Sequence, residues 1–198
     1  MVIDWLVRKT TDWLISKNVV AADDKDIYEY AMYCTLISYI PILYIVVVSA
    51  LFGWFGKFIF FWIPFVLIRK FSGGYHANST EKCLLFSCTL LTICLIIVKN
   101  LYYSHFILLI GVIAAIGICV LSPVESVNKP LTKAEKKQYG MITIGIVCFM
   151  ELLSCVFLHF KDYDVVMCMQ LSIIMVFVFV GVESVLNIKK TTISSDSL

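Results

Sequence analysis

Residues 164–187 read DVVMCMQLSIIMVFVFVGVESVLN, an apolar run long enough to cross a bilayer as a single helix. A hydrocarbon core about 30 Å thick requires about 20 apolar helical residues. Five further apolar segments precede this run, at 28–52, 54–68, 80–98, 102–121 and 140–160. The pattern predicts an all-α integral membrane protein.

The composition agrees with that fold class. The 198 residues are 61% hydrophobic and 15% charged, with a mean hydropathy of +0.92. Soluble domains are about half apolar and about a quarter charged, so a soluble enzyme is excluded. The eight cysteines are scattered and form no C-x-x-C pair, which argues against a disulfide framework or a zinc ribbon.

The number of crossings has two interpretations. Segment 54–68 is short and carries Pro64, and segment 80–98 reaches full length only if its helix begins near Asn78. Either segment could insert halfway into the membrane. We therefore predict about six transmembrane helices, or four plus two partial insertions.

The sequence predicts separate segments at both ends of the membrane domain. Residues 1–26 are predicted to form an amphipathic helix (2–18) in the headgroup region, followed by an acidic hinge. A helix packed on its own protein is an equal alternative. Residues 27–190 would form the polytopic domain, and residues 191–198 a disordered tail.

The basic residues predict one orientation. With the N-terminus in the cytoplasm, only Lys57, Lys99 and Lys161 of the 16 lysines and arginines fall outside. The positive-inside rule then places both termini and the loops 69–83 and 122–139 on the cytoplasmic side of the cell membrane.

A histidine and a cysteine lie close together in the polar stretch 69–83. A thiol becomes a strong nucleophile when a base takes its proton, and His76 is a candidate base for Cys83. The amides of Gly73 and Gly74 could form an oxyanion hole. The alternative is an interfacial histidine next to an ordinary helix residue. His105 and His159 fall at the opposite membrane face and no H-E-x-x-H motif occurs, so we expect no metal site and no cofactor.

The spacing R-x₃-G-G-x-H-A-x₅-C resembles the signature of the accessory gene regulator B (AgrB) family, and is carried by Arg69, Gly73, Gly74, His76, Ala77 and Cys83. This family comprises membrane cysteine endopeptidases of Gram-positive peptide quorum sensing. The resemblance extends over nearly the whole chain. It implies that His76 and Cys83 are the catalytic pair, and that Arg69 and Gly74 are also needed.

The resemblance also implies the substrate. It would be a short propeptide with an amphipathic membrane helix, a signal segment and an acidic C-terminal tail. The enzyme would remove the tail and leave the signal segment as a cyclic thiolactone or lactone. A thioester on Cys83 is consistent with this product, because exchange of one thioester for another nearly conserves free energy. A partly dry site would also keep water from hydrolysing the thioester.

Two further polar features have open interpretations. The basic cluster of Lys129, Lys133, Lys136 and Lys137 is either a topology signal or a binding site for the acidic tail. Among the intramembrane carboxylates, we expect Glu151 to form a helix–helix hydrogen bond and Glu183 to pair with a lysine.

Two rival functions remain, a small transporter or peptide-export subunit without proteolytic activity and a non-catalytic scaffold. The expected partners are the propeptide and the lipid bilayer, with no nucleic acid; the sequence leaves homodimerisation open.

Overall fold

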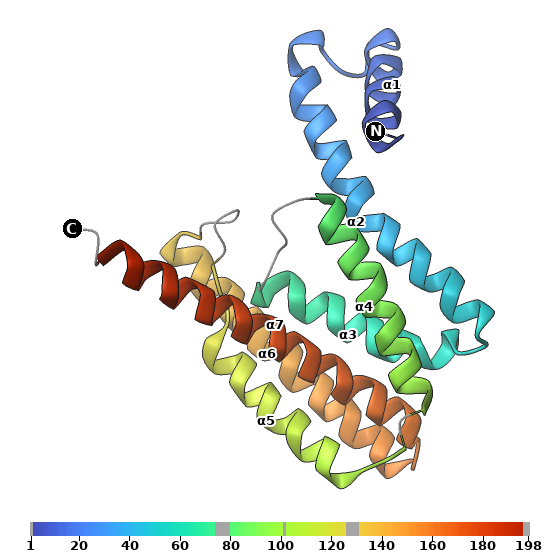
Figure 1. Ribbon diagram of the computed structural model, residues 1–198, viewed down its shortest axis with the longest axis vertical. Coiled ribbons are helices and arrows are strands. Elements are labelled where there is room, and N and C mark those ends of the chain that lie inside the picture. Colours follow the sequence, from blue (N-terminus) through green and yellow to red (C-terminus); the bar gives the residue numbers. More distant parts are fainter. Residues whose placement is uncertain (1, 74–79, 101, 126–130, 196–198) are drawn as a thin grey trace. The chain divides into compact units, whose positions relative to one another are not determined.

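The computed structural model describes residues 2–73, 80–100, 102–125 and 131–195, except for the side chains of residues 2, 38, 80–83 and 188–195. Regular structure in these ranges is helical, with a short 3₁₀ helix at Ala22–Asp24. The α-helices are α1 Val2–Ser16, α2 Lys25–Leu51, α3 Phe55–Ser72, α4 Thr80–Asn100, α5 His105–Leu121, α6 Lys133–His159 and α7 Tyr163–Ser195 (Figure 1). The predicted all-α class is confirmed.

Helices α3, α6 and α7 extend furthest beyond the apolar segments that predicted them. Helix α3 continues to Ser72, α6 begins at Lys133 inside the predicted loop 122–139, and α7 reaches Ser195 inside the predicted disordered tail. Extending an existing helix adds one hydrogen bond per residue without a new nucleation cost, so polar residues at its ends can join it.

The start of α6 has a specific cause. The Glu135 amide donates to Thr132 Oγ1 over 3.3 Å, and the Thr132 amide donates to Glu135 Oε2 over 2.9 Å. This capping box satisfies two backbone donors that the first turn would otherwise leave unpaired.

Among the described residues, three helices have the length and composition to cross a membrane, namely Ala22–Leu51, Lys133–His159 and Tyr163–Asn187. Leu84–Asn100 and His105–Leu121 are shorter apolar helices. The length and composition of these helices support a membrane protein. The choice between six crossings and four plus two stays a prediction.

The chain divides into two compact units. Unit 1 comprises residues 1–48 and 78–92, and unit 2 comprises residues 49–77 and 93–198. In unit 1, Lys25 at the start of α2 pairs with Asp12 of α1 over 2.7 Å. Helix α1 buries Val7 and Thr11 and exposes Trp5 and Trp13, so one side packs on protein and the other carries aromatic side chains suited to a headgroup layer.

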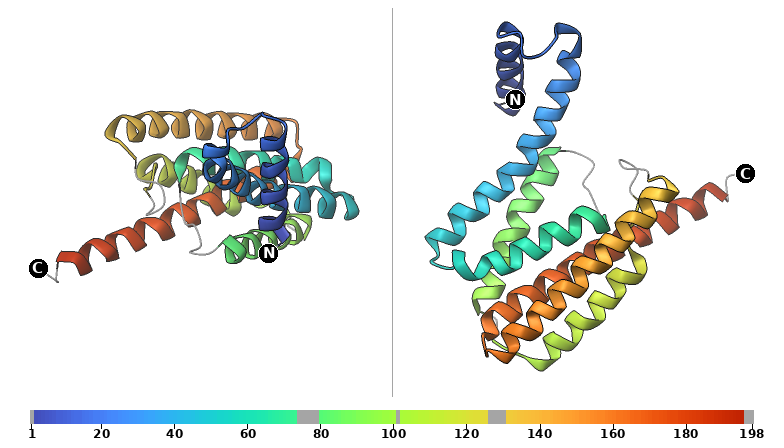
Figure 2. Two further views of the ribbon diagram at one scale, coloured as in Figure 1. Left: turned by 90° about the horizontal axis from the view of Figure 1, so that it is seen from above. Right: turned by 180° about the vertical axis from the view of Figure 1, so that it is seen from behind.

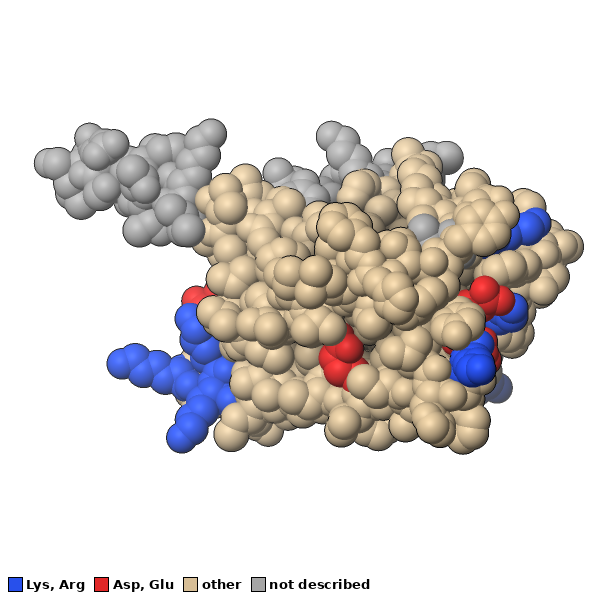
Figure 3. Space-filling view, turned by 90° about the horizontal axis from the view of Figure 1, so that it is seen from below, with Lys and Arg blue, Asp and Glu red and all other residues tan. Residues whose placement is uncertain are grey.

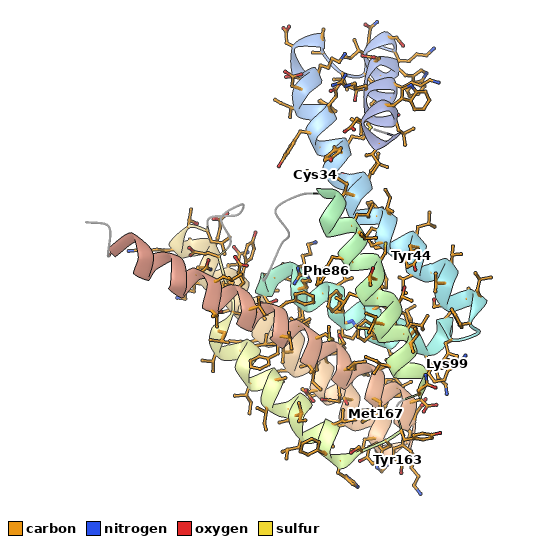
Figure 4. All side chains as sticks on the ribbon, viewed as in Figure 1. Cys34, Tyr44, Phe86, Lys99, Tyr163 and Met167 are labelled. Atoms are coloured by element: carbon orange, nitrogen blue, oxygen red, sulfur yellow. The ribbon has the colours of Figure 1, made fainter. Side chains whose placement is uncertain are left out.

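Helix α7 is the centre of unit 2. It contacts α3, α5 and α6, and it runs alongside α5 and α6 in the ribbon views (Figures 1 and 2). All six residues from Val165 to Gln170 are buried, including Met167 (Figure 4). Farther along, burial narrows to one face at Ile173, Val176 and Val180, a helical spacing that faces the surrounding helices.

Small residues bring α5 close to α7. A Cβ added at Gly111 would overlap the side-chain oxygen of Gln170, and one added at Gly117 would overlap the ring of Phe177. Small residues at helix contacts allow this approach, and van der Waals packing then holds the helices together.

A buried polar cluster joins α6 to α7. Gln170 is fully buried, and its amide donates to Glu151 Oε2 and to Ser154 Oγ, each over 3.1 Å. The expected helix–helix hydrogen bond of Glu151 is therefore confirmed. Glu183 is only 5% exposed, and no lysine pairs with it among the described side chains.

We predict that Gly111→Ala destabilises unit 2, because the new methyl group must displace the hydrogen-bonded Gln170. Overpacking of this kind costs about 1–3 kcal/mol. Gly145→Ala in α6 is the matched control, since its Cβ would meet no atom within 4 Å. Thermal unfolding in detergent should show a lower midpoint for Gly111→Ala alone. Equal midpoints for the two variants would contradict the packing described here.

Candidate active site

Arg69 lies in the last turn of α3, in unit 2. Its guanidinium carbon is 4.4 Å from the centroid of the Phe179 ring of α7. A desolvated cation on an aromatic face is stabilised by up to about 2 kcal/mol. Arg69, the first residue of the polar stretch 69–83, is thus held at a defined place between α3 and α7.

Gly73 ends α3 and cannot readily be another residue. Its φ is +76°, in the region that favours glycine, and a Cβ there would overlap the carbonyl oxygen of Val124. The adjacent Ser72 carbonyl accepts a hydrogen bond from the Val124 amide over 2.9 Å, and Gly73 and Val124 form an isolated parallel β-bridge. The chain therefore leaves α3 paired with the segment that follows α5.

The other members of the predicted catalytic set are only partly described. Gly74 and His76 lie outside the described residues, as does the side chain of Cys83. The backbone of Cys83 is helical, near the described start of α4 at Thr80, and belongs to unit 1. This agrees with the helix expected over 80–98.

The basic cluster borders an open groove in unit 2. Lys133, Lys136 and Lys137 line it, together with Ser122, Pro123, Gly140, Met141 and Ile144. Lys129 lies outside the described residues. The lining thus combines three lysines with the apolar side chains of Pro123, Met141 and Ile144. Basic side chains also gather at one edge of the largely uncharged face shown in Figure 3.

Glu125 forms an ion pair with one lysine of this groove, Lys136. Its carboxylate lies 3.3 Å from the Lys136 ammonium, with both side chains about half exposed. An exposed pair of this kind contributes at most about 1 kcal/mol. An incoming carboxylate could therefore replace Glu125 at little cost.

Sequence reasoning missed three residues that organise this end of unit 2: Val124, Glu125 and Asn187. The Asn187 amide of α7 donates to the Glu125 carbonyl over 2.6 Å. The contact joins positions far apart in the chain, so no local spacing could reveal it. The only signal was an amide side chain at the end of the apolar run 164–187.

Comparisons with known proteins agree with one another. The sequence model of the family described as "Accessory gene regulator B" matches residues 7–180. An AgrB-like protein of Clostridium perfringens (strain SM101 / Type A) is 28% identical over 76% of each chain. A second AgrB-like protein, from C. perfringens (strain 13 / Type A), is 26% identical over 76% of each chain. No solved structure matches.

We predict that Gly73→Ala weakens the Ser72–Val124 pairing. The Val124 amide should then exchange its hydrogen roughly tenfold faster, since the Gly73 backbone (φ +76°, ψ −151°) lies in a region essentially restricted to glycine, where another residue is strained by about 1–3 kcal/mol. Gly53→Ala is the matched control, because Gly53 has a φ of +70° but open space around its Cβ. Hydrogen-exchange mass spectrometry of the peptide covering 122–125 makes the measurement. Unchanged exchange in Gly73→Ala would show that the pairing does not depend on this glycine.

Proposed function

The chain belongs to the accessory gene regulator B family, and we propose that it serves quorum-sensing peptide processing as a membrane cysteine endopeptidase. The main support for this proposal is that the family match over residues 7–180 includes the whole polar stretch 69–83, with its histidine and cysteine. A thiol near the N-terminal end of a helix is favoured as the thiolate by the helix dipole, which supports the choice of Cys83 as nucleophile.

The first step is acyl transfer to the enzyme. His76 takes the thiol proton, and the Cys83 sulfur attacks the carbonyl carbon that joins the signal segment to its acidic tail. The carbon–nitrogen bond breaks, a carbon–sulfur bond remains, and His76 returns the proton to the leaving amine. The products are a thioester on Cys83 and a released tail.

The second step closes the ring. A thiol or hydroxyl within the signal segment attacks the thioester, its proton passes through His76, and Cys83 leaves as a thiol. The tethered nucleophile has a high effective concentration, so it competes with water in a site that is partly dry. No external energy source is needed for a thiolactone, because one thioester replaces another.

Three residues would support this chemistry. The amides of Gly73 and Gly74 are candidates for stabilising the oxyanion. Arg69 is a supporting residue, and its stacking on Phe179 gives it a fixed position at the end of α3.

We predict that Cys83→Ala, Cys83→Ser and His76→Ala each reduce propeptide cleavage by at least about a hundredfold, since each removes the nucleophile or its base. Cys88→Ala, in the same helix, and His105→Ala, at the start of α5, are the matched controls and should cleave normally. Cleavage is measured in reconstituted membranes at equal protein levels.

An independent measurement uses thiol alkylation. A variant that retains Cys83 alone should react rapidly near neutral pH, and His76→Ala should slow that reaction. Normal cleavage by Cys83→Ala would exclude the cysteine mechanism. It would favour a transporter or a scaffold.

We further propose that the basic groove binds the acidic tail of the propeptide, on the cytoplasmic side. The lysines lie in the first turns of α6, where positive charge opposes the helix dipole. They therefore do not stabilise their own helix. Carboxylates of the tail would be complementary in charge to the lysines of the groove. Apolar residues of the tail would pack on Met141 and Ile144.

We predict that replacing Lys129, Lys133, Lys136 and Lys137 together by glutamine raises the half-saturating propeptide concentration more than it lowers turnover. Each exposed pair contributes at most about 1 kcal/mol, so single variants should change little. The increase in the half-saturating concentration should be smaller at higher salt, because salt screens exposed charges. Lys99→Gln with Lys161→Gln controls for general loss of positive charge.

Because basic loops also set orientation, topology must be verified first in the quadruple variant. A correctly oriented quadruple variant with unchanged half-saturation would leave the cluster as a topology signal.

A further inference from the structure

The segment 122–125 joins the end of α3 to α7. On one side, the Val124 amide donates to the Ser72 carbonyl over 2.9 Å, and the Val124 carbonyl occupies the space where a Gly73 side chain would lie. On the other side, the Asn187 amide donates to the Glu125 carbonyl over 2.6 Å. Two consecutive residues of one short segment therefore contact two different helices.

The Asn187 contact is the stronger of the two restraints on Glu125. It is a short hydrogen bond in a partly buried place, whereas the Glu125–Lys136 ion pair is exposed to solvent. Screening weakens an exposed pair, and a hydrogen bond shielded from water loses less to competition. The backbone at Glu125 is thus fixed mainly by α7.

We propose that Asn187 is a positioning residue of the peptidase. Its amide holds the segment 122–125, and that segment sets the direction in which the chain leaves α3 at Gly73, three residues before His76. The proposal rests on the proposed function of His76 and Cys83. In this proposal Asn187 acts through the backbone, by way of its hydrogen bond to the Glu125 carbonyl next to Val124.

The physical reason is the sensitivity of acyl transfer to alignment. A displacement of about 1 Å in a catalytic group can reduce a rate by about a hundredfold. A helix end paired with a neighbouring backbone samples fewer directions than one that ends in solvent. Loss of the Asn187 donor should therefore reduce turnover and leave propeptide binding nearly intact.

The test compares Asn187→Leu with Asn100→Leu. Leucine is close to asparagine in size and lacks the donor. Asn100 is the matched control because its amide donates to the Ile96 carbonyl of its own helix over 2.8 Å, so its loss is local. We expect the turnover number of Asn187→Leu to fall roughly tenfold, with half-saturation within about twofold of the wild type, and Asn100→Leu to behave as the wild type.

Asn187→Asp is the second variant, in case the leucine prevents insertion. It keeps the size of the side chain and replaces the amide by a carboxylate, which is ionised near neutral pH and cannot donate, so turnover should fall in the same way. Hydrogen exchange at Val124 should rise in both Asn187 variants. Full turnover in a correctly inserted Asn187→Asp would overturn the proposal. A raised half-saturation with unchanged turnover would also overturn it, because it would indicate direct substrate contact.

Failure of the proposed function has a different signature. In that case Cys83→Ala would cleave normally, whatever the Asn187 variants do. If cleavage depends on Cys83 and is unaffected by loss of the Asn187 donor, only the positioning role is wrong.

Discussion

Burial of α7 among α3, α5 and α6 is the constraint on which unit 2 depends. A lipid bilayer offers no hydrophobic driving force between helices, so close packing must supply the attraction. The first turns of α7 are buried on all sides, and Gly111 and Gly117 of α5 permit the close approach. Of the described residues proposed to support catalysis, Arg69 stacks directly on Phe179 of this helix, and Gly73 is linked to it through Val124 and Glu125.

Polar contacts at two levels of α7 give the packing its specificity. Near the start of the helix, Gln170 bonds to Glu151 and Ser154, and near its other end Asn187 bonds to the Glu125 carbonyl. Burying an amide without a partner costs several kcal/mol in an apolar medium, roughly 4–8 kcal/mol on the strictest scale. A rotated or shifted α7 would separate the buried Gln170 amide from Glu151 and Ser154 and would break the Asn187–Glu125 hydrogen bond. These contacts therefore favour one register of α7, and that register determines where the end of α3 lies.

The sequence predicted the helices well and the contacts between them poorly. Apolar runs located the described helices α2 to α7, but α6 begins at Lys133 because of a capping box, seven residues before the apolar pattern starts. The partners of Gln170 and Asn187 come from distant segments, so local periodicity could not indicate them. Of the candidate site, Arg69 and Gly73 have defined places and the lysines line one groove, whereas the pairing of His76 with Cys83 still rests on motif spacing and the family match.

The weakness of exposed ion pairs suits the proposed reaction. After the first step, the amine of the released tail can attack the Cys83 thioester and reverse the cleavage. A groove that held the tail tightly would keep that amine at a high effective concentration and favour reversal. If the proposed tail binding holds, solvent-exposed lysines on an open groove would provide several small attractions that together capture the propeptide, and they would release a short acidic peptide once the covalent link is broken. Modest tail affinity then favours ring closure, because the ring nucleophile stays tethered while the competing amine diffuses away.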